Sequence, residues 1–406
     1  MTEIAISNAS AFSRILIVIS ALALASCTQS ATQFDSSNAN PNARLEAEQL
    51  PARPLTAKVE GESVGSGPIR VAMLLPKSAS GAAGLAGTEL ANAAKMAMQD
   101  FAGGRFQLVI KDTRGQPSEA ASLAFQARDE GATLVLGPLF SANVSSASAV
   151  TEPAKIPMIA FSSDIARARP NVYLLSFAPD ADIRRTLRYG FSSGANRVVA
   201  LLPQSSYGRL AEKEMRSVYD QLGGQIVSVV RYPRDAEAIT EAARSVAQAA
   251  KDANAIYIPE GGRVPALVLN ALKKAGVRLR DKLVMGSGQW TSTSNRNSVL
   301  NGAIYAGADK TNFQTFAERY KQTYGNDPTV TAALGYDAIS LTAELIRRSA
   351  QAPFSAQNIQ SRSGFRGATG IFRFEADGRL QRALVVNRIE AGQPVIISPA
   401  PSGFVR

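Results

Sequence analysis

The chain of 406 residues contains no histidine and only one cysteine, Cys27. Without histidine, no Ser-His-Asp triad, Cys-His dyad or imidazole metal site can form. With a single cysteine, the chain can make neither an intrachain disulfide nor a Cys-x-x-Cys metal knuckle. Paired carboxylates, as in glycoside hydrolases, are the enzyme chemistry that this composition leaves open. The sequence therefore predicts a protein that is not an enzyme and that uses no metal and no cofactor.

The chain also has fewer acidic than basic residues. It carries 44 Lys and Arg against 33 Asp and Glu, which gives a formal net charge of +11. A basic surface suits nucleic acid, anionic lipid or an anionic wall polymer. The basic residues are dispersed, without the interleaved aromatic residues that single-strand binders use. We therefore expect no nucleic-acid partner, and a basic surface that serves only solubility explains the charge equally well.

The apolar run near the start of the chain is too short for a comfortable transmembrane helix, which needs about 20 residues. This run, 15–24, follows Arg14 and ends at small residues before Cys27. A positive residue, a short apolar core and small residues before a cut site describe a secretory signal peptide. The sequence Leu24-Ala25-Ser26-Cys27 resembles the bacterial lipobox, in which the cysteine is lipidated and becomes the mature N-terminus.

We therefore expect a signal peptide over residues 1–26, lipidation at Cys27, and contact with a membrane through this N-terminal lipid only. The alternative is a cleaved signal with an incidental cysteine. Thr28 follows the cysteine, and by resemblance to enterobacterial lipoproteins this favours the outer over the inner membrane of the periplasm. Residues 27–68 are rich in Ser, Asn, Ala and Pro without an apolar period, and so predict a disordered tether.

From Ile69 onward, short apolar runs alternate with segments of helical periodicity. Such β-α-β alternation predicts an α/β fold with parallel sheets that helices cover on both faces. Strands are expected at 69–75, 106–110, 133–136, 157–160, 197–202, 225–230, 255–258 and 282–285. Residues 370–374 and 383–389 are expected to form a hairpin, because Asp377-Gly378 is a hairpin-turn sequence. Two doubly wound units therefore fill residues 69–310.

Gly81, Gly84 and Gly87 follow the first strand and open a helix. A dinucleotide-binding fingerprint needs glycine at its first, third and sixth positions. Here the third position is Ala83, so the segment predicts a strand–helix loop and no nucleotide site.

Several segments resemble the type I periplasmic binding proteins, the class of the Leu/Ile/Val-binding proteins. They include "LVLGPLFSANVSS", "IPMIAFSSD", "SSYGR" and "LGYDAISLTAELIRR", and the resemblance extends over roughly 69–395. It is most pronounced with the alphaproteobacterial lipoproteins that are named penicillin-binding protein activators. The fold implied has two lobes with a cleft between them: lobe 1 at 69–178 plus 309–350, and lobe 2 at 179–308 plus 351–395.

The resemblance implies two alternative functions. The first is a non-enzymatic lipoprotein that regulates peptidoglycan synthesis by activating a penicillin-binding protein. The second is the substrate-binding protein of an ABC transporter for an amino acid or a small amide. The transport receptor needs a cleft that closes on a ligand, whereas the regulator needs an exposed surface for its protein partner and can lack a ligand.

In open parallel sheets, ligands collect outside the carboxyl ends of the strands. The residues there that are candidates for the cleft are Ser141, Ser162, Ser163, Asp164, Tyr207, Glu260, Gln289 and Trp290. In the amino-acid receptors, the loops that correspond to Ser141 and to 162–164 contact the carboxylate and the amino group of the ligand. Ser141 fits equally well as a helix N-cap. Tyr207 corresponds to an aromatic residue that faces the cleft in the receptors. The alternative is that Tyr207 packs against the helix that follows it.

The loop after Met285 departs from that pattern. Amino-acid receptors place an acidic residue there to pair with the ammonium group of the ligand. Here the loop reads Gly-Ser-Gly-Gln-Trp and has no carboxylate. A buried ammonium group without a partner would cost several kcal/mol. Glu260, from a neighbouring loop, is the predicted substitute, and Trp290 predicts a more filled cleft.

Overall fold

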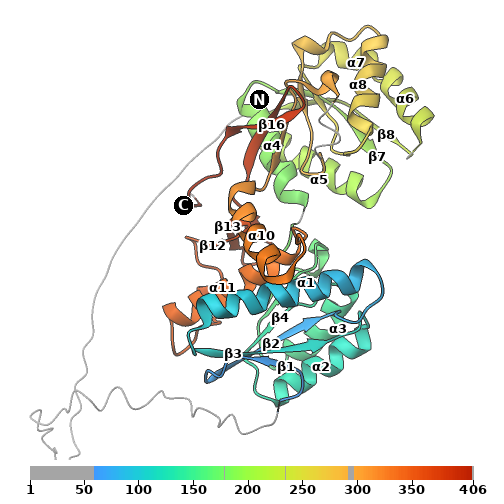
Figure 1. The fold of residues 1–406 in the computed structure, drawn as a ribbon. Helices are drawn as coiled ribbons and strands as arrows, with labels where there is room; N and C mark the ends of the chain where they lie inside the picture. Colours follow the sequence, from blue (N-terminus) through green and yellow to red (C-terminus); the bar gives the residue numbers. More distant parts are fainter. Residues whose placement is uncertain (1–58, 178, 234, 291–296, 405–406) are drawn as a thin grey trace, which may run out of the picture. The chain divides into compact units, whose positions relative to one another are not determined.

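The computed structural model describes residues 59–177, 179–233, 235–290 and 297–404. These residues form three sheets, shown in Figure 1. Sheet A has the strand order β1-β3-β2-β4-β5-β6, sheet B the order β16-β15-β11-β10-β9-β7-β8, and sheet C the order β12-β13-β14. Sheets A and B are mainly parallel, so the predicted α/β class with two doubly wound sheets is confirmed.

Sheet A consists of β1 (Glu62–Val64), β2 (Ile69–Leu75), β3 (Phe106–Asp112), β4 (Leu134–Leu136), β5 (Met158–Ala160) and β6 (Val172–Leu174). Its helices are α1 (Ala82–Ala97), α2 (Pro117–Asp129), α3 (Ser141–Thr151), α10 (Lys310–Tyr324) and α11 (Ala332–Arg348). The apolar residues of α1 and α11 pack on one face of the sheet, and those of α2 and α3 on the other. Six of the seven residues of β2 are buried, as expected of a parallel strand covered on both faces.

Sheet B consists of β7 (Arg197–Pro203), β8 (Gln225–Tyr232), β9 (Ala255–Tyr257), β10 (Leu283–Met285), β11 (Ile304–Gly307), β15 (Val385–Glu390) and β16 (Gln393–Ser398). Its helices are α4 (Pro179–Ser192), α5 (Ser206–Leu222), α6 (Ala236–Ser245), α7 (Ala247–Asp252) and α8 (Val264–Lys274). Helices α4 and α5 pack on one face, and α6, α7 and α8 on the other. Strand β15 joins the parallel strands through an antiparallel pairing with β11.

The end of the predicted tether is ordered in the described part of the chain. Strand β1 pairs antiparallel with β3, with Glu62 opposite Ile110. The Glu62 carboxylate forms ion pairs with Lys77 (2.7 Å) and Lys95 (2.8 Å), which fix the strand at the edge of the sheet. Such a short polar strand has no apolar period, so the sequence did not reveal it. The predicted signal peptide and Cys27 lie outside the described residues.

The predicted assignment of 351–395 to lobe 2 is wrong for its first part. Strands β12 (Phe365–Gly367), β13 (Gly370–Phe374) and β14 (Leu380–Arg382) form sheet C. The buried rings of Phe365, Phe372 and Phe374 belong to the same core as sheet A and α11. The Asp377-Gly378 turn therefore joins β13 to β14, and only the residues from Val385 onward enter sheet B.

A buried polar network ties α11 to sheet C. The Asp337 carboxylate accepts hydrogen bonds from the backbone N–H of Ala368 (2.6 Å) and from the Thr369 hydroxyl. Arg382 donates to the Thr369 hydroxyl (2.6 Å) and to the carbonyl of Ser176 (3.0 Å), just before α4. Burial lowers the pKa of Arg382 to about 10 and raises the pKa of Asp337, although each charge favours the other. The network therefore links the buried carboxylate of Asp337, through Thr369, to the partly buried guanidinium of Arg382.

Candidate functional site

A polar cluster lies at the carboxyl ends of β4 and β5 in sheet A. Ser141 is the first residue of α3, and its hydroxyl donates a hydrogen bond to Asp164. This bond is the main cause of the lowered pKa of Asp164. Arg167 pairs with the same carboxylate (3.2 Å) and donates to the Ser145 hydroxyl (2.7 Å). The Ser141 hydroxyl is therefore used by Asp164, and the N-cap interpretation does not hold.

The two remaining candidates of sheet A differ in exposure. The Ser162 side chain is buried, and its hydroxyl accepts a hydrogen bond from the backbone N–H of Asp164 (3.2 Å). Ser163 is exposed. The structure thus gathers Ser141, Ser162 and Asp164 into one bonded set, with Ser163 at its surface.

A second cluster lies at the carboxyl ends of β9 and β10 in sheet B. The Tyr207 hydroxyl donates to Ser287 (2.8 Å), which is fully buried and itself donates to the carbonyl of Pro259 (2.5 Å). Burial raises the pKa of Tyr207 well above its usual value. Glu260 is buried and accepts a hydrogen bond from Tyr232 (3.1 Å). The loops after the two strands are therefore cross-linked by hydroxyl groups.

The sequence did not single out Asp182, yet it stands beside this cluster. Asp182 lies in the first turn of α4, and a Cβ added to Gly288 would lie 2.3 Å from its Oδ2. Burial raises the pKa of Asp182 well above the usual range, and nearby Asp180 raises it further, although the N–H of Gly288 opposes this. Among the described residues, six buried side-chain atoms lack a hydrogen-bond partner, and two of them, Asp182 Oδ1 and the Tyr257 hydroxyl, adjoin this cluster. A carboxylate thus occupies the space beside the loop that itself carries none.

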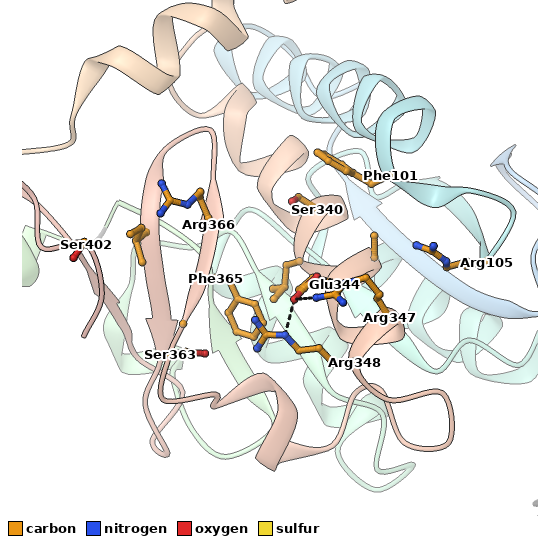
Figure 2. A pocket seen from close by; sticks show the side chains of 14 residues that line it. Phe101, Arg105, Ser340, Glu344, Arg347, Arg348, Ser363, Phe365, Arg366 and Ser402 are labelled. Atoms are coloured by element: carbon orange, nitrogen blue, oxygen red, sulfur yellow. Dashed lines mark hydrogen bonds and ion pairs between the residues drawn. The ribbon is translucent and has the colours of Figure 1, made fainter. Parts of the chain in front are cut away.

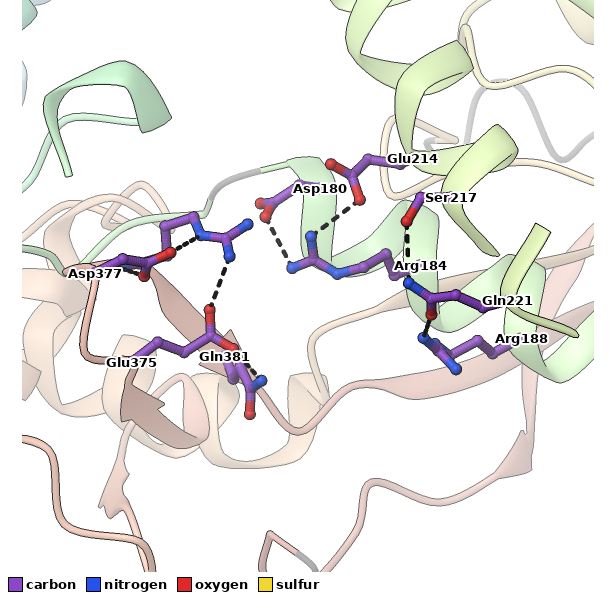
Figure 3. A network of polar contacts seen from close by, with 10 residues as sticks. Asp180, Arg184, Arg188, Glu214, Ser217, Gln221, Glu375, Asp377 and Gln381 are labelled. Atoms are coloured by element: carbon purple, nitrogen blue, oxygen red, sulfur yellow. Dashed lines mark hydrogen bonds and ion pairs between the residues drawn. The ribbon is translucent and has the colours of Figure 1, made fainter. Parts of the chain in front are cut away.

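Arg184 anchors the turn of α4 that presents Asp182. Its guanidinium donates to Asp180 (2.8 Å) and to Glu214 of α5 (3.1 Å), as Figure 3 shows. In the same view, Arg188 donates to Gln221 (2.6 Å), which ties α4 to α5 one turn further along. These bonds bridge the two helices, so α4 holds Asp182 in place against sheet B.

The last two candidates differ in exposure: Gln289 lies at the surface and Trp290 is buried. Gln289 is exposed, and its backbone N–H donates to the Ser287 hydroxyl (3.1 Å). Trp290 is 3% exposed, belongs to the core of sheet B, and donates its indole N–H to the carbonyl of Ile258 (3.0 Å). This placement corrects the expectation that the ring fills a ligand cleft, because the ring fills the core instead.

The described part of the chain brings together no set of three metal-ligating side chains. None of its helices is both long enough and apolar enough to cross a membrane. The polar groups at the strand ends are hydroxyls, carboxylates and one guanidinium, which suit hydrogen bonding to a small polar molecule.

The model of the family described as periplasmic binding protein matches residues 68–394. The chain belongs to this family. Its fold is similar to that of a putative branched-chain amino acid ABC transporter protein from Rhodospirillum rubrum. The TM-score is 0.69 at 20% identity, over 81% of this chain and 99% of that one. The likeness to this structure concerns the fold, which is that of type I periplasmic binding proteins.

Two curated relatives have names that describe different functions. A Leu/Ile/Val-binding protein homolog of Brucella abortus is 23% identical over 279 residues, which cover 64% of this chain and 70% of that protein. The penicillin-binding protein activator LpoA of Serratia proteamaculans is 28% identical over 121 residues, which cover 30% of this chain. The matched stretch spans only 18% of the length of the activator.

The substitution Asp182→Asn should change how stability depends on pH. Burial raises the pKa of Asp182 in the folded state above its unfolded value, so folding favours the protonated carboxyl. Its contribution to the free energy of unfolding is present below the unfolded pKa and is lost as pH rises through the folded pKa. The advantage of the asparagine variant should therefore grow between pH 4 and neutral pH. Urea unfolding across this range measures it, and a pH-independent difference would contradict the account.

Proposed function

We propose that the chain is a non-enzymatic periplasmic receptor that binds an amino acid or a small amide for an ABC transporter. In this proposal, Cys27 carries a lipid that anchors the protein, to the outer membrane in preference to the inner one. The observation that carries the proposal is the pair of buried polar atoms without partners, Asp182 Oδ1 and the Tyr257 hydroxyl. Buried polar groups are nearly always hydrogen-bonded, so such a pair favours a ligand that supplies the missing bonds.

The chemistry of the two clusters suits an amino acid or an amide. Asp182 Oδ1 has no hydrogen-bond partner and can accept from an ammonium or amide N–H, and Asp182 thus supplies the acid that the loop after Met285 lacks. On sheet A, Arg167 and the exposed hydroxyl of Ser163 are donors for a carboxylate. The ligand would lie between the two clusters, in the cleft that this fold family forms between its lobes.

A screen of ligands by thermal unfolding tests the proposal. The panel contains the amino acids and their amides, added to the purified full-length protein. A ligand that binds only the folded state adds about 2.7 kcal/mol at a hundredfold excess over its Kd, so one member should give a saturable rise in Tm. We expect Asp182→Asn and Tyr207→Phe to remove most of that rise. The control Asp220→Asn, at an exposed position on α5, should keep it.

If no member of the panel raises Tm, the proposal fails. It also fails if the ligand stabilises Asp182→Asn as much as the native protein, because the carboxylate would then make no contact with the ligand. A rise that Asp220→Asn loses as well would mean that net charge, and not this site, governs binding.

A second candidate function is the activation of a penicillin-binding protein. The partial similarity to LpoA favours it, but only over the 121 matched residues. An activator needs an interface of about 1,200–2,000 Å² in total, which must lie on an outer surface. The full-length protein would then capture a penicillin-binding protein of the same organism and raise its polymerising or crosslinking rate. The variants Ser141→Ala, Ser163→Ala and Tyr207→Ala should leave that effect intact. If no penicillin-binding protein binds or changes rate, this candidate is excluded.

A further inference from the structure

The described part of the chain also has a pocket whose lining includes none of the residues of the candidate site. It has a volume of about 450 Å³ and lies between α11, the β12–β13 hairpin and the turn that precedes β3. Figure 2 shows it from close by. Pockets of about 300–1,000 Å³ are of the size that binds ligands or inserted side chains.

The pocket carries an excess of positive charge. Four arginines line it, Arg105, Arg347, Arg348 and Arg366, against one acidic residue, Glu344. Glu344 forms ion pairs with Arg347 (2.7 Å) and Arg348 (2.6 Å), and these two arginines also lie in the last turn of α11, where the helix dipole favours them. Their place is thus explained by the helix itself.

Neither an ion pair nor a helix dipole accounts for the positions of Arg105 and Arg366. Both are exposed, and neither forms a hydrogen bond or an ion pair with another described residue. In Figure 2 their guanidinium groups lie on opposite sides of the pocket. One small anion would therefore meet one of them, whereas an extended ligand with separated negative groups would meet both.

The floor between these charges is apolar. Leu341 and Phe365 are buried there, and Phe101 and Ile371 are partly exposed. The Arg348 guanidinium lies over the Phe365 ring at 5.1 Å. An apolar side chain of a ligand would therefore find a matching surface, with guanidinium groups above it.

The charged rim continues beyond this pocket. Arg366 also lines a second hollow of about 240 Å³, together with Phe316, Arg319 and Tyr336. Arg319 is neutralised by Asp100 (2.9 Å), so Arg366 is the free positive charge that the two hollows share. Two adjacent hollows with a shared arginine fit a peptide chain better than a compact small molecule.

We propose that this surface, lined by Arg105, Arg347, Arg348 and Arg366, binds an acidic segment of a protein partner. One apolar side chain of that segment enters the pocket against the partly exposed Phe101 and Ile371, and its flanking carboxylates pair with Arg105 and Arg366. Arginine and aromatic residues are enriched at the centres of protein interfaces, as they are here. The inference is independent of the ligand proposed above, because the residues of the two sites do not overlap.

The test uses a fluorescent probe peptide, acetyl-Asp-Glu-Phe-Glu-Asp-amide, and the purified full-length protein, with polarisation as the readout. The native protein should bind the probe and lose affinity as salt rises from 50 to 300 mM, since exposed charges are screened. Each of Arg105→Glu and Arg366→Glu should weaken binding by about tenfold, and the milder Arg105→Gln and Arg366→Gln by less. The matched control is Lys213→Glu with Lys273→Glu, which reverses two exposed charges on α5 and α8.

Three results would overturn the proposal. The native protein fails to bind the probe, the control pair weakens binding as much as the two arginine reversals, or phthalate competes as well as the peptide. The last result would identify a small dianion as the occupant. Unchanged Tm in the glutamine variants excludes loss of fold as the cause of weaker binding.

Discussion

Trp290→Ala should lower the free energy of unfolding by about 3–5 kcal/mol, the usual cost of removing a large aromatic side chain from a core. The ring is 3% exposed and packs beside Tyr305, with ring centroids 6.2 Å apart. Its other neighbour is Gly286, where an added Cβ would lie 2.2 Å from the indole. Alanine leaves a cavity there and also leaves the Ile258 carbonyl without its indole donor. Urea denaturation measures the loss.

Trp290→Phe is the matched control. It keeps most of the apolar volume but removes the N–H donor, so its loss should be clearly smaller than that of alanine. If alanine costs under about 1 kcal/mol, the ring is not a core residue, and the interpretation that it fills a ligand cleft returns.

Arg382→Met should lower the free energy of unfolding by about 1–3 kcal/mol, the usual penalty when buried hydrogen-bonding groups lose their partner. The methionine keeps much of the apolar stem of arginine, so packing is retained while the charge is lost. Asp337 then stays buried without the positive charge that opposes its desolvation. The contacts of Arg382 with Ser176 and Thr369 also disappear. The loss would appear as a lower urea midpoint with an unchanged slope.

The double variant Asp337→Asn with Arg382→Met separates the charge effect from packing. Because it removes both charges together, it should lose less than the sum of the two single variants. Strictly additive losses would show that Asp337 and Arg382 do not interact, and the network described between α11 and sheet C would then be incorrect.

The alternation of apolar runs and helical segments was enough to predict most of the parallel strands, since a strand buried on both faces must be apolar throughout. It did not predict the short parallel strands β6 and β11. Strand β1 and sheet C were also missed or misassigned. Both are short, and their places depend on contacts with residues far away in the sequence, such as Glu62 with Lys95 and Phe372 with the sheet A core.

The sequence predicted those residues of the candidate site that directly follow strands. The sequence places Ser141 and Asp164 after neighbouring strands, and the structure joins them by a hydrogen bond. It could not place Asp182, because the approach of α4 to Gly288 is a tertiary contact between residues more than a hundred positions apart. In the sequence, Asp182 is only an acidic residue in the first turn of a helix. The helix dipole alone would explain such a residue, so it did not indicate a binding site.

The most direct test of the receptor proposal is a crystal structure of the full-length protein with the ligand that raises its Tm most. The account predicts that a nitrogen of the ligand lies within hydrogen-bond distance of Asp182 Oδ1, with the Tyr257 hydroxyl also bonded. A ligand bound elsewhere, with Asp182 Oδ1 still buried and without a partner, would contradict it.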